Sequence, residues 1–428
     1  MTRKRWGIVF RLSILALTIL LLLPSSSIRA QASGPDAWRM YGHDARHSNC
    51  SAASGPAAAK IKWTHKTDGE ISSVIVGPDG VVYFTLKVFA QADRVVALNP
   101  DGSEKWKKDV RTMKYVYLAL GANRALYIYG DYGEKSKPYV MAVEAADGKA
   151  KWMVHLSGTY NTYGRLTIGK DGTIYVPVAL GGKNSAKQSG MIYALNPDGS
   201  QKWAWKSKDV NCGIETTPAL AQNGTLYVQH NTMCLVALDS KSGKLLWTVG
   251  GLGWMWNSPS VGADNTVYIG NSDNSFCAVN PNGKIKWKAT VENWMYYTTN
   301  AHSPDGALVY RGDNNGVLYA FDTKAGTIRW RFRVNKETWF GHTPVVAANG
   351  IIYFTSGGWT TSMSDTAQGY LYALNASTGA LLWKYKVGFA NQDPAIGPDG
   401  TLYVVADQPG LKGDLRWGNC RWLQAFAR

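Results

Sequence analysis

A tryptophan recurs along this chain at the end of the same short motif. The motif runs Ala-Leu-Asn-Pro-Asp-Gly-Ser-Glu-Lys-Trp at residues 97–106, and successive copies place their tryptophans 40 to 53 residues apart. Further copies end at Trp152, Trp203, Trp247, Trp287, Trp330 and Trp383. Self-similarity at this period predicts a repeat fold, because each copy is a small unit that buries its apolar face only against its neighbours.

A second motif, a tight turn followed by a short apolar strand, lies inside every repeat. One copy is Gly-Pro-Asp-Gly-Val-Val-Tyr-Phe at residues 77–84. Other copies begin at Gly121 (a degenerate version), Gly169, Ala221, Gly262, Ser303, Ala347 and Gly397. The Asp-Gly and Asn-Gly pairs supply the positive φ angles of tight hairpins, and the β-branched and aromatic residues that follow favour strands. We therefore expect four strands in each repeat, the fourth carrying the tryptophan.

Four-stranded units at this period are typical of β-propeller blades. The last repeat ends with its third strand, Trp-Leu-Gln-Ala-Phe at residues 422–426, and an isolated fourth strand, Lys-Ile-Lys-Trp at residues 60–63, precedes the first repeat. The two fragments complete one blade. The sequence therefore predicts an all-β, eight-bladed propeller of four-stranded antiparallel blades. It is closed by pairing the N- and C-terminal strands, which removes open sheet edges.

These motifs resemble those of a known family. The Ala-x-Asp/Asn-x-x-x-Gly-x-x-x-Trp pattern is similar to the tryptophan-docking motif of the pyrroloquinoline quinone (PQQ) propeller repeat. Residues 38–44, Trp-Arg-Met-Tyr-Gly-His-Asp, resemble the segment that opens many such propellers. The resemblance covers roughly residues 36 to 428 and implies that Trp63, Trp106 and the six tryptophans named above pack between neighbouring blades. The family includes quinone-dependent dehydrogenases and outer-membrane assembly scaffolds, so the resemblance implies a fold rather than one activity.

The dehydrogenases of this family hold a calcium ion with a carboxylate and an amide and use an aspartate as base. The resemblance implies Glu215 and Asn257 as cofactor-binding residues in that case, and Asp393 as the catalytic base. The chain departs from those enzymes because it lacks adjacent cysteines, and it has no Cys-x-x-Cys-His for a haem. No zinc-ligand spacing or phosphate loop is present either. We expect no cofactor and no catalytic residue, with PQQ and Ca²⁺ as the alternative.

The N-terminus has the pattern of a targeting segment. Arg3, Lys4 and Arg5 precede an apolar run at residues 12–23, and Ala-Gln-Ala follows at residues 30–32. This pattern predicts a signal peptide at residues 1–32, a lead-in segment at 33–59 and a single propeller at 60–428. The alternative is an uncleaved anchor, although the run is short for a transmembrane helix. We expect a secreted or periplasmic monomer without stable membrane insertion.

The chain is strongly basic. Its formal net charge of +16 falls to +11 without residues 1–32, which carry five basic residues and no acid. Lysines and arginines flank the docking tryptophans, as at residues 105–108 and 329–331. We interpret them as a solvated outer edge that deters edge-to-edge pairing; the alternative is weak attraction to an anionic polymer or membrane surface. We expect no nucleic-acid partner, because no nucleic-acid module is present.

Five cysteines are present, and export permits disulfides. Cys212 and Cys234 fall in the same repeat, and Cys50 and Cys420 each lie just before a strand of the closing blade. We predict bridges within both pairs and a buried free thiol at Cys277. The alternative is that all five are unpaired, since spacing does not fix connectivity.

Aromatic side chains concentrate in the inter-blade loops, which join the outer strand of one blade to the inner strand of the next. The candidate ligand residues are Trp254, Trp256, Asn257, Trp294, Tyr296, Tyr297, His302, Trp339, Phe340 and His342. These loops border the centre of a propeller, so rigid aromatic side chains beside polar ones would suit a partner protein or a glycan. The alternative is that the aromatic side chains only fill the centre of the ring.

Two insertions, at residues 181–190 and 356–369, fall between second and third strands. Long polar loops on a rigid ring suit partner contact, and the sequence leaves open which face of the ring they occupy. We expect an exported, non-catalytic PQQ-like propeller that binds a protein or glycan through its central funnel face. The alternatives are a PQQ-dependent dehydrogenase of alcohols or sugars and an outer-membrane protein assembly scaffold.

Overall fold

The computed structural model describes residues 36–88, 93–110, 116–132, 137–158, 164–180, 189–208, 213–214, 216–230, 234–252, 257–295, 299–334, 342–356, 369–388, 390, 392–407 and 421–428. The chain divides into two units, Met1–Ser33 and Gly34–Arg428. All the described residues lie in the second unit. Among them no helix is long and apolar enough to cross a membrane.

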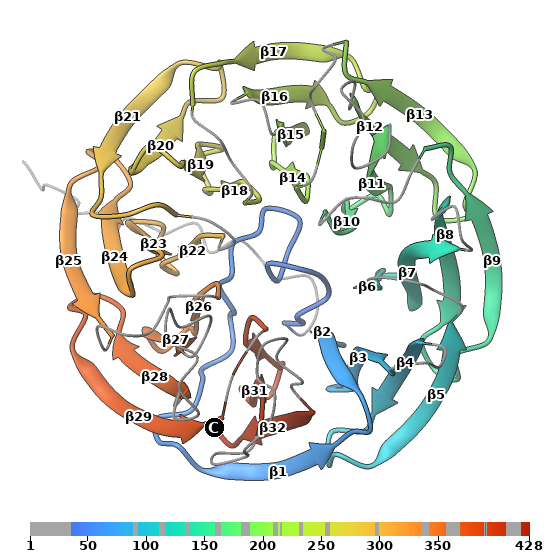
Figure 1. Ribbon diagram of the computed structural model, residues 1–428, viewed down its shortest axis with the longest axis horizontal. Coiled ribbons are helices and arrows are strands. Elements are labelled where there is room, and N and C mark those ends of the chain that lie inside the picture. Colours follow the sequence, from blue (N-terminus) through green and yellow to red (C-terminus); the bar gives the residue numbers. More distant parts are fainter. Residues whose placement is uncertain are drawn as a thin grey trace, which may run out of the picture. The chain divides into compact units, whose positions relative to one another are not determined.

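The described residues form eight four-stranded antiparallel sheets and no helix, which confirms the predicted all-β propeller (Figure 1). The innermost strands are β2 (Glu70–Val76), β6 (Tyr117–Leu120), β10 (Thr167–Ile168), β14 (Ala219–Leu220), β18 (Ser260–Val261), β22 (Ala301–His302), β26 (Val345–Val346) and β30 (Ala395–Ile396). The second strands are β3 (Val82–Lys87), β7 (Ala125–Tyr132), β11 (Ile174–Leu180), β15 (Thr225–His230), β19 (Val267–Gly270), β23 (Leu308–Gly312), β27 (Ile351–Ser356) and β31 (Leu402–Ala406).

The third strands are β4 (Asp93–Leu98), β8 (Lys137–Glu144), β12 (Ser189–Leu195), β16 (Cys234–Asp239), β20 (Ser275–Val279), β24 (Val317–Asp322), β28 (Gly369–Asn375) and β32 (Trp422–Phe426). The outermost strands are β5 (Glu104–Val110), β9 (Ala150–His155), β13 (Gln201–Lys206), β17 (Leu245–Val249), β21 (Ile285–Thr290), β25 (Ile328–Arg333), β29 (Leu381–Val387) and β1 (Ile61–Lys66). Blades 1 to 7 follow chain order from β2. Blade 8 joins β30, β31 and β32 to β1, as predicted, and Trp63 is paired opposite Ala425.

The two sequence motifs align across each blade. In blade 1, Tyr83 of the turn-strand motif pairs with Ala97, and Ala97 pairs with Trp106. The register shifts next to the tryptophan in all eight blades, so each outer strand carries a β-bulge at this position. A bulge bends the strand and re-aims its side chain. The rings of Tyr83 and Trp106 lie 6.0 Å apart, and the same pair recurs in every blade.

The tryptophans pack between blades, which confirms the docking role that the resemblance implied. Trp106 donates a hydrogen bond from Nε1 to the carbonyl of Ala145 in blade 2, at 3.0 Å. Six others make the same bond to the next blade at 2.9 to 3.1 Å. Trp383 is the exception, since its buried Nε1 has no partner in the described structure. Its neighbour, blade 8, takes its third and outer strands from opposite ends of the chain, so no turn there offers the carbonyl.

Because successive strands in each blade run in opposite directions, the loops of the propeller divide between two faces. The turns between first and second strands and between third and fourth strands lie at one end of each blade, the turn face. The inter-blade loops and the connections between second and third strands lie at the other end, the inter-blade face. The strands that flank the two insertions, β11 and β12 in blade 3 and β27 and β28 in blade 7, therefore have their connected ends at the inter-blade face.

The prediction of a bridge between Cys50 and Cys420 was wrong about Cys50, which is an unpaired thiol. The lead-in segment runs inside the ring of blades, so Cys50 pairs through its backbone with Val346 and packs among apolar residues of blades 6 and 7. Burial raises the pKa of this thiol to about 12. Cys277 is a buried free thiol, as predicted. Cys212 and Cys420 lie outside the described residues, so the pairing of Cys212 with Cys234 stays a prediction.

Candidate functional site

Residues 36–56 of the lead-in segment cross the centre of the ring and form a plug (Figure 1, blue). Within the described residues, six of the eight blades donate a backbone hydrogen bond to it. Each donor is the last residue of an innermost strand: Val76, Leu120, Leu220, Val261, His302 and Val346. The acceptors are the carbonyls of Trp38, Arg39, Ala45, Arg46, Ser48 and Asn49, at 2.7 to 2.9 Å. Because these donors precede the first turns, the plug lies at the turn end of the central axis.

A carboxylate clasp holds the plug in shape. Asp36 accepts hydrogen bonds from His43 Nε2 at 2.9 Å, from the Ser51 hydroxyl and from the Ala52 backbone at 2.7 Å. Burial pushes the pKa of Asp36 up, but the bond and charge of His43, with the Ser51 and Ala52 bonds, outweigh it and bring that pKa to about 2. Burial likewise pushes the pKa of His43 down, and the Asp36 carboxylate raises it above its ordinary value.

Nearer the inter-blade face, polar side chains from six consecutive blades form a hydrogen-bonded arc, the central polar arc. Each residue stands three positions before the end of an innermost strand, roughly 10 Å along the strand from the plug contacts. Its members are Arg165, Thr217, Ser258, Thr299, Thr343 and Asp393.

Each member of the arc contacts the next. The Arg165 backbone donates to Thr217 Oγ1, and the Thr217 backbone donates to Ser258 Oγ, both at 3.0 Å. Thr299 joins Ser258 to Thr343 through bonds of 2.8 and 3.1 Å, and the Thr343 backbone donates to Asp393 Oδ1 at 2.8 Å. The arc therefore ties blades 3 to 8 together around the axis.

The side chain of Tyr41 extends from the plug to the central polar arc. The guanidinium of Arg165 lies 4.2 Å from the centre of the Tyr41 ring and 5.2 Å from that of Tyr117, a cation–π arrangement. Burial, with the negative charge of Asp393, raises the pKa of Tyr41 to about 12, so the hydroxyl is neutral at physiological pH. Hydrogen bonds from Thr343 and Ser258 oppose this rise. Tyr41 and Arg165 both keep part of their surface exposed to solvent.

His342 and Asp393 lie together on the opposite end of the arc. His342 Nε2 donates to the carbonyl of Ala390 at 2.9 Å, which leaves Nδ1 3.9 Å from Asp393 Oδ1. Burial lowers the pKa of His342, so the imidazole is neutral at physiological pH. The side chains are 13% and 21% exposed, so both reach solvent. These two predicted residues are thus neighbours.

Two other predicted residues lie between blades 5 and 6 rather than on the surface. Asn257 is 3% exposed and donates from Nδ2 to the carbonyls of Gly270 and Met295, while its Oδ1 has no partner among the described residues. His302 is 6% exposed, with Nε2 2.9 Å from Ser260 Oγ, and burial lowers its pKa to about 3. Arg311 is fully buried beside them and donates to Met295 O and Asn300 Oδ1, at 2.7 Å each.

Of the remaining predicted ligand residues, the structure describes Trp294. It lies on the inter-blade face and is 50% exposed, the largest exposure among the described large apolar side chains. Seven predicted site residues lie outside the described residues: Glu215, Trp254, Trp256, Tyr296, Tyr297, Trp339 and Phe340. The structure therefore brings His342 and Asp393 together, separates Asn257 and His302 from them, and leaves the aromatic cluster a prediction.

The described residues do not by themselves fit a calcium–quinone site. Calcium takes six to eight oxygen ligands, usually including carboxylates. The Oδ1 of Asn257 is one suitable oxygen, but Asp393 stands in blade 8, three blades away, and its Oδ1 already accepts a backbone hydrogen bond. No group of three His, Cys, Asp or Glu side chains in the described part of the chain could hold a metal ion.

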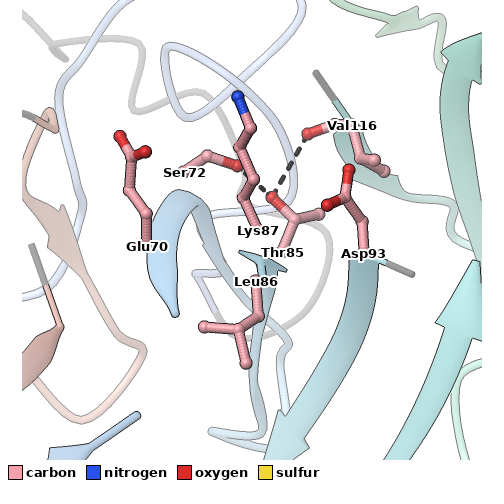
Figure 2. Close-up of a pocket in the computed structure, with 7 residues that line it drawn as sticks. All are labelled: Glu70, Ser72, Thr85, Leu86, Lys87, Asp93 and Val116. Atoms are coloured by element: carbon pink, nitrogen blue, oxygen red, sulfur yellow. Dashed lines mark hydrogen bonds between the residues drawn. The ribbon is translucent and has the colours of Figure 1, made fainter. Parts of the chain in front are cut away.

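A small recess lined partly by charged residues lies on the inter-blade face, between blades 1 and 2 (Figure 2). It is lined by Glu70, Ser72, Thr85, Leu86, Lys87, Asp93 and Val116. The hydroxyls of Ser72 and Thr85 are hydrogen bonded to each other, and Thr85 also bonds to the carbonyl of Val116 at 3.2 Å. The inter-blade face thus carries charged side chains both here and near the axis.

Tyr41, Arg165 and the hydroxyl residues of the central polar arc were not predicted from the sequence. A signal was present, because Thr217, Ser258, Thr343 and Asp393 are each followed by proline and then by the two-residue innermost strand. A polar residue recurring before Pro at a fixed distance from each turn motif marks equivalent positions around a ring. The innermost strands are too short to show alternation, which hid that pattern.

Comparison with known proteins gives one family match. The family model described as outer membrane protein assembly factor BamB matches residues 188–314 and 314–424, more than half of the chain. BamB of Moranella endobia (strain PCIT) is 26% identical over 265 residues, 56% of this chain and 64% of that protein. The dehydrogenase subunit of the quinone alcohol dehydrogenase of Gluconobacter oxydans (strain 621H) is 28% identical over 232 residues, 53% of this chain and 26% of that one. The matches thus span less than two thirds of both relatives.

Solved structures share the fold. The crystal structure of the quinohemoprotein alcohol dehydrogenase from Comamonas testosteroni superposes with a TM-score of 0.67 and 15% identity, over 93% of this chain and 81% of that one. BamB from Moraxella catarrhalis superposes with a TM-score of 0.56 and 16% identity, over 87% and 98%. Identities this low indicate a common fold alone, and the two structures carry different functions on it.

Proposed function

The chain belongs to the family of PQQ-like eight-bladed propellers that includes outer membrane protein assembly factor BamB, and from this membership we propose that it is a non-catalytic scaffold of the bacterial envelope. It holds a protein partner on its inter-blade face. The signal peptide predicted at residues 1–32 and the outer-membrane function named for the BamB relatives support a periplasmic or envelope location. We propose that the protein is monomeric.

The plug is the observation that carries this proposal. Six blades use the turn-end donors of their innermost strands to bind the chain's own lead-in segment, so that end of the axis is already occupied. The inter-blade face instead presents Trp294, the charged recess of blades 1 and 2 and the partly exposed end of the central polar arc. Exposed aromatic side chains among polar groups are typical of interface anchors.

Site-specific photo-crosslinking in the native envelope tests the orientation. A photoreactive residue replaces Trp294 on the inter-blade face, and a matched variant carries it at exposed Lys324 on the turn face. We expect a discrete crosslinked protein, identified by mass spectrometry, from position 294 and none from position 324. Equal crosslinking from both positions, or from 324 alone, would contradict the assignment of the face. If the partner is a glycan, neither position gives a protein adduct, and the protein instead binds to a glycan array.

A second candidate function, PQQ-dependent oxidation of alcohols or sugars, is favoured by the buried Oδ1 of Asn257, which has no partner among the described residues. The test is a titration of the calcium-loaded protein with PQQ, followed by tryptophan fluorescence and by dye-linked oxidation. We expect no saturable binding. Tight binding with turnover, lost in Asn257→Leu and kept in Asn257→Asp, would replace the scaffold proposal, with Glu215 and Asp393 as the other site residues.

A further inference from the structure

Two opposite charges stand in the central polar arc without pairing with each other. Arg165 comes from blade 3 and Asp393 from blade 8, and they are the only members of the arc that carry a charge. No ion pair within 4.0 Å joins either of them to an acid or base other than His342 in the described structure. The charges of Arg165 and Asp393 both affect the pKa of the same two side chains, Tyr41 and His342. Both charged groups therefore lie near the same central region.

Both charged groups are held in place before any ligand arrives. The Asp393 carboxylate is fixed through Oδ1 by the Thr343 backbone, which leaves Oδ2 without a described partner. The Arg165 guanidinium stacks on Tyr41 and Tyr117 and has no described hydrogen bond from its side-chain nitrogens. Groups fixed in advance lose little conformational entropy on binding, which favours affinity.

Among the described residues, the groups that neighbour Arg165 and Asp393 do not neutralise these charges. Tyr41 and His342 are both neutral at physiological pH, for the reasons given above, and the remaining members of the arc are hydroxyl side chains. A partly buried charge without a partner is unfavourable. A ligand that supplies a carboxylate to Arg165 and an ammonium to Asp393 would relieve both charges at once, through charge-assisted hydrogen bonds.

We propose that the central polar arc binds a zwitterionic ligand of the amino acid or short peptide class, with its carboxylate on Arg165 and its ammonium on Asp393. The hydroxyls of Tyr41, Ser258 and Thr343 lie at the same level and can bind the remaining polar atoms. The site lies toward the same inter-blade face as the proposed protein partner, but it depends on Arg165 and Asp393 rather than on Trp294. Calorimetry with small ligands and crosslinking at position 294 therefore test the two proposals separately.

Titration calorimetry on the full mature chain tests the site with defined probes. Glycine, diglycine and triglycine vary the separation of ammonium and carboxylate, and a panel of the proteinogenic L-amino acids varies the side chain. We expect saturable binding for at least one probe. N-acetylation or C-terminal amidation of that probe should weaken binding at least about tenfold, because each removes one charge-assisted pair. No binding by any member of both series would overturn the proposal.

Charge-neutralising variants locate the ligand. Arg165→Gln removes the positive charge and keeps a polar side chain, and Asp393→Asn preserves size and keeps an oxygen for the Thr343 backbone. Each should weaken binding of the probe at least about tenfold. Lys324→Gln, on the turn face, is the control and should leave binding unchanged. Thermal unfolding of each variant without ligand confirms folding. If acetate or phosphate bound as tightly as the zwitterion, and Asp393→Asn had no effect, the site would be a simple anion site and the proposal would be wrong.

Discussion

Gly283 lies directly against the indole of Trp247, close enough that a Cβ there would stand 3.0 Å from Cδ2 of the ring. Gly283 also has a φ of +84°, which side-chain-bearing residues rarely adopt. The docking motif therefore requires glycine twice over, for the turn and for contact with the tryptophan of the preceding blade. The same glycine–tryptophan contact recurs at six further blade junctions.

Removal of a docking tryptophan should destabilise the ring. Trp247→Ala is expected to lower the free energy of unfolding by about 3–5 kcal/mol, since removal of this large, partly buried ring leaves a gap between two blades. Urea unfolding measures this free energy, and a decrease of less than about 1 kcal/mol would contradict the docking role.

Trp247→Phe and Trp383→Phe separate the hydrogen bond from the packing. Trp247 loses its bond to Pro281 O in the first variant, whereas Trp383 loses a buried N–H that has no described partner. We expect Trp247→Phe to cost about 1 kcal/mol more than Trp383→Phe, the usual net value of a hydrogen bond. Equal losses in urea unfolding would mean that the N–H contributes nothing at the junction.

The central polar arc should stabilise the ring through its hydroxyls. Thr343→Val removes the acceptor of the buried Thr299 backbone N–H, and an unpaired buried donor costs about 1–3 kcal/mol. Thr355→Val is the matched control, because the buried Thr355 hydroxyl has no described partner, and it should be neutral or slightly stabilising. If the two variants unfolded at the same denaturant concentration, the arc would not contribute to stability.

Buried histidines should make the protein acid-sensitive. The pKa of His302 is lowered to about 3 and that of His47 to about 4, both mainly by burial, against an ordinary 6.5. Below pH 6.5 the unfolded chain binds protons that the folded chain does not, so stability is complete above this pH and falls as the pH drops toward 4.

Each histidine is expected to account for a loss of about 2 kcal/mol in the free energy of unfolding between about pH 7 and about pH 5. Urea unfolding at both pH values should show a smaller difference for His302→Gln than for the unmodified protein. His155→Gln, at an exposed position of β9, is the control. An unchanged pH dependence in His302→Gln would contradict the assigned protonation.

The Asp36 clasp should hold the plug in the ring. Asp36→Ala leaves His43, Ser51 and the Ala52 backbone without their acceptor, so the plug should exchange its hydrogen bonds with solvent more readily. Hydrogen exchange should then accelerate at the amides of Leu120, Leu220, Val261 and Val346, which donate to the plug. Asp101→Ala, in an exposed turn, is the control. Unchanged exchange in Asp36→Ala would show that the clasp does not hold the plug.

The repeated motifs made most of the fold predictable. The Tyr of one motif and the Ala and Trp of the other align across three strands in every blade, so the same local pairing is encoded eight times. The location of Cys50 was not predictable, because nothing in its local sequence says that the lead-in segment passes inside the ring rather than around it. Asn257 and His302 were expected on a surface for the same reason: position in a loop does not reveal which blade will cover it.

The sequence by itself determined the eight blades, their strand order, the docking tryptophans and the blade closed between the two ends of the chain. Apart from the closing blade, these features depend on contacts between residues within about one repeat of each other, which turn chemistry and strand patterning encode locally. The closing blade was predictable because each end of the chain carries the strands that the other end lacks. Only the tertiary structure decided that residues 36–56 plug the axis and that Tyr41, Arg165 and Asp393 meet there. Those residues are separated by more than a hundred positions from one another, and closing the ring is the physical step that brings them to a common centre.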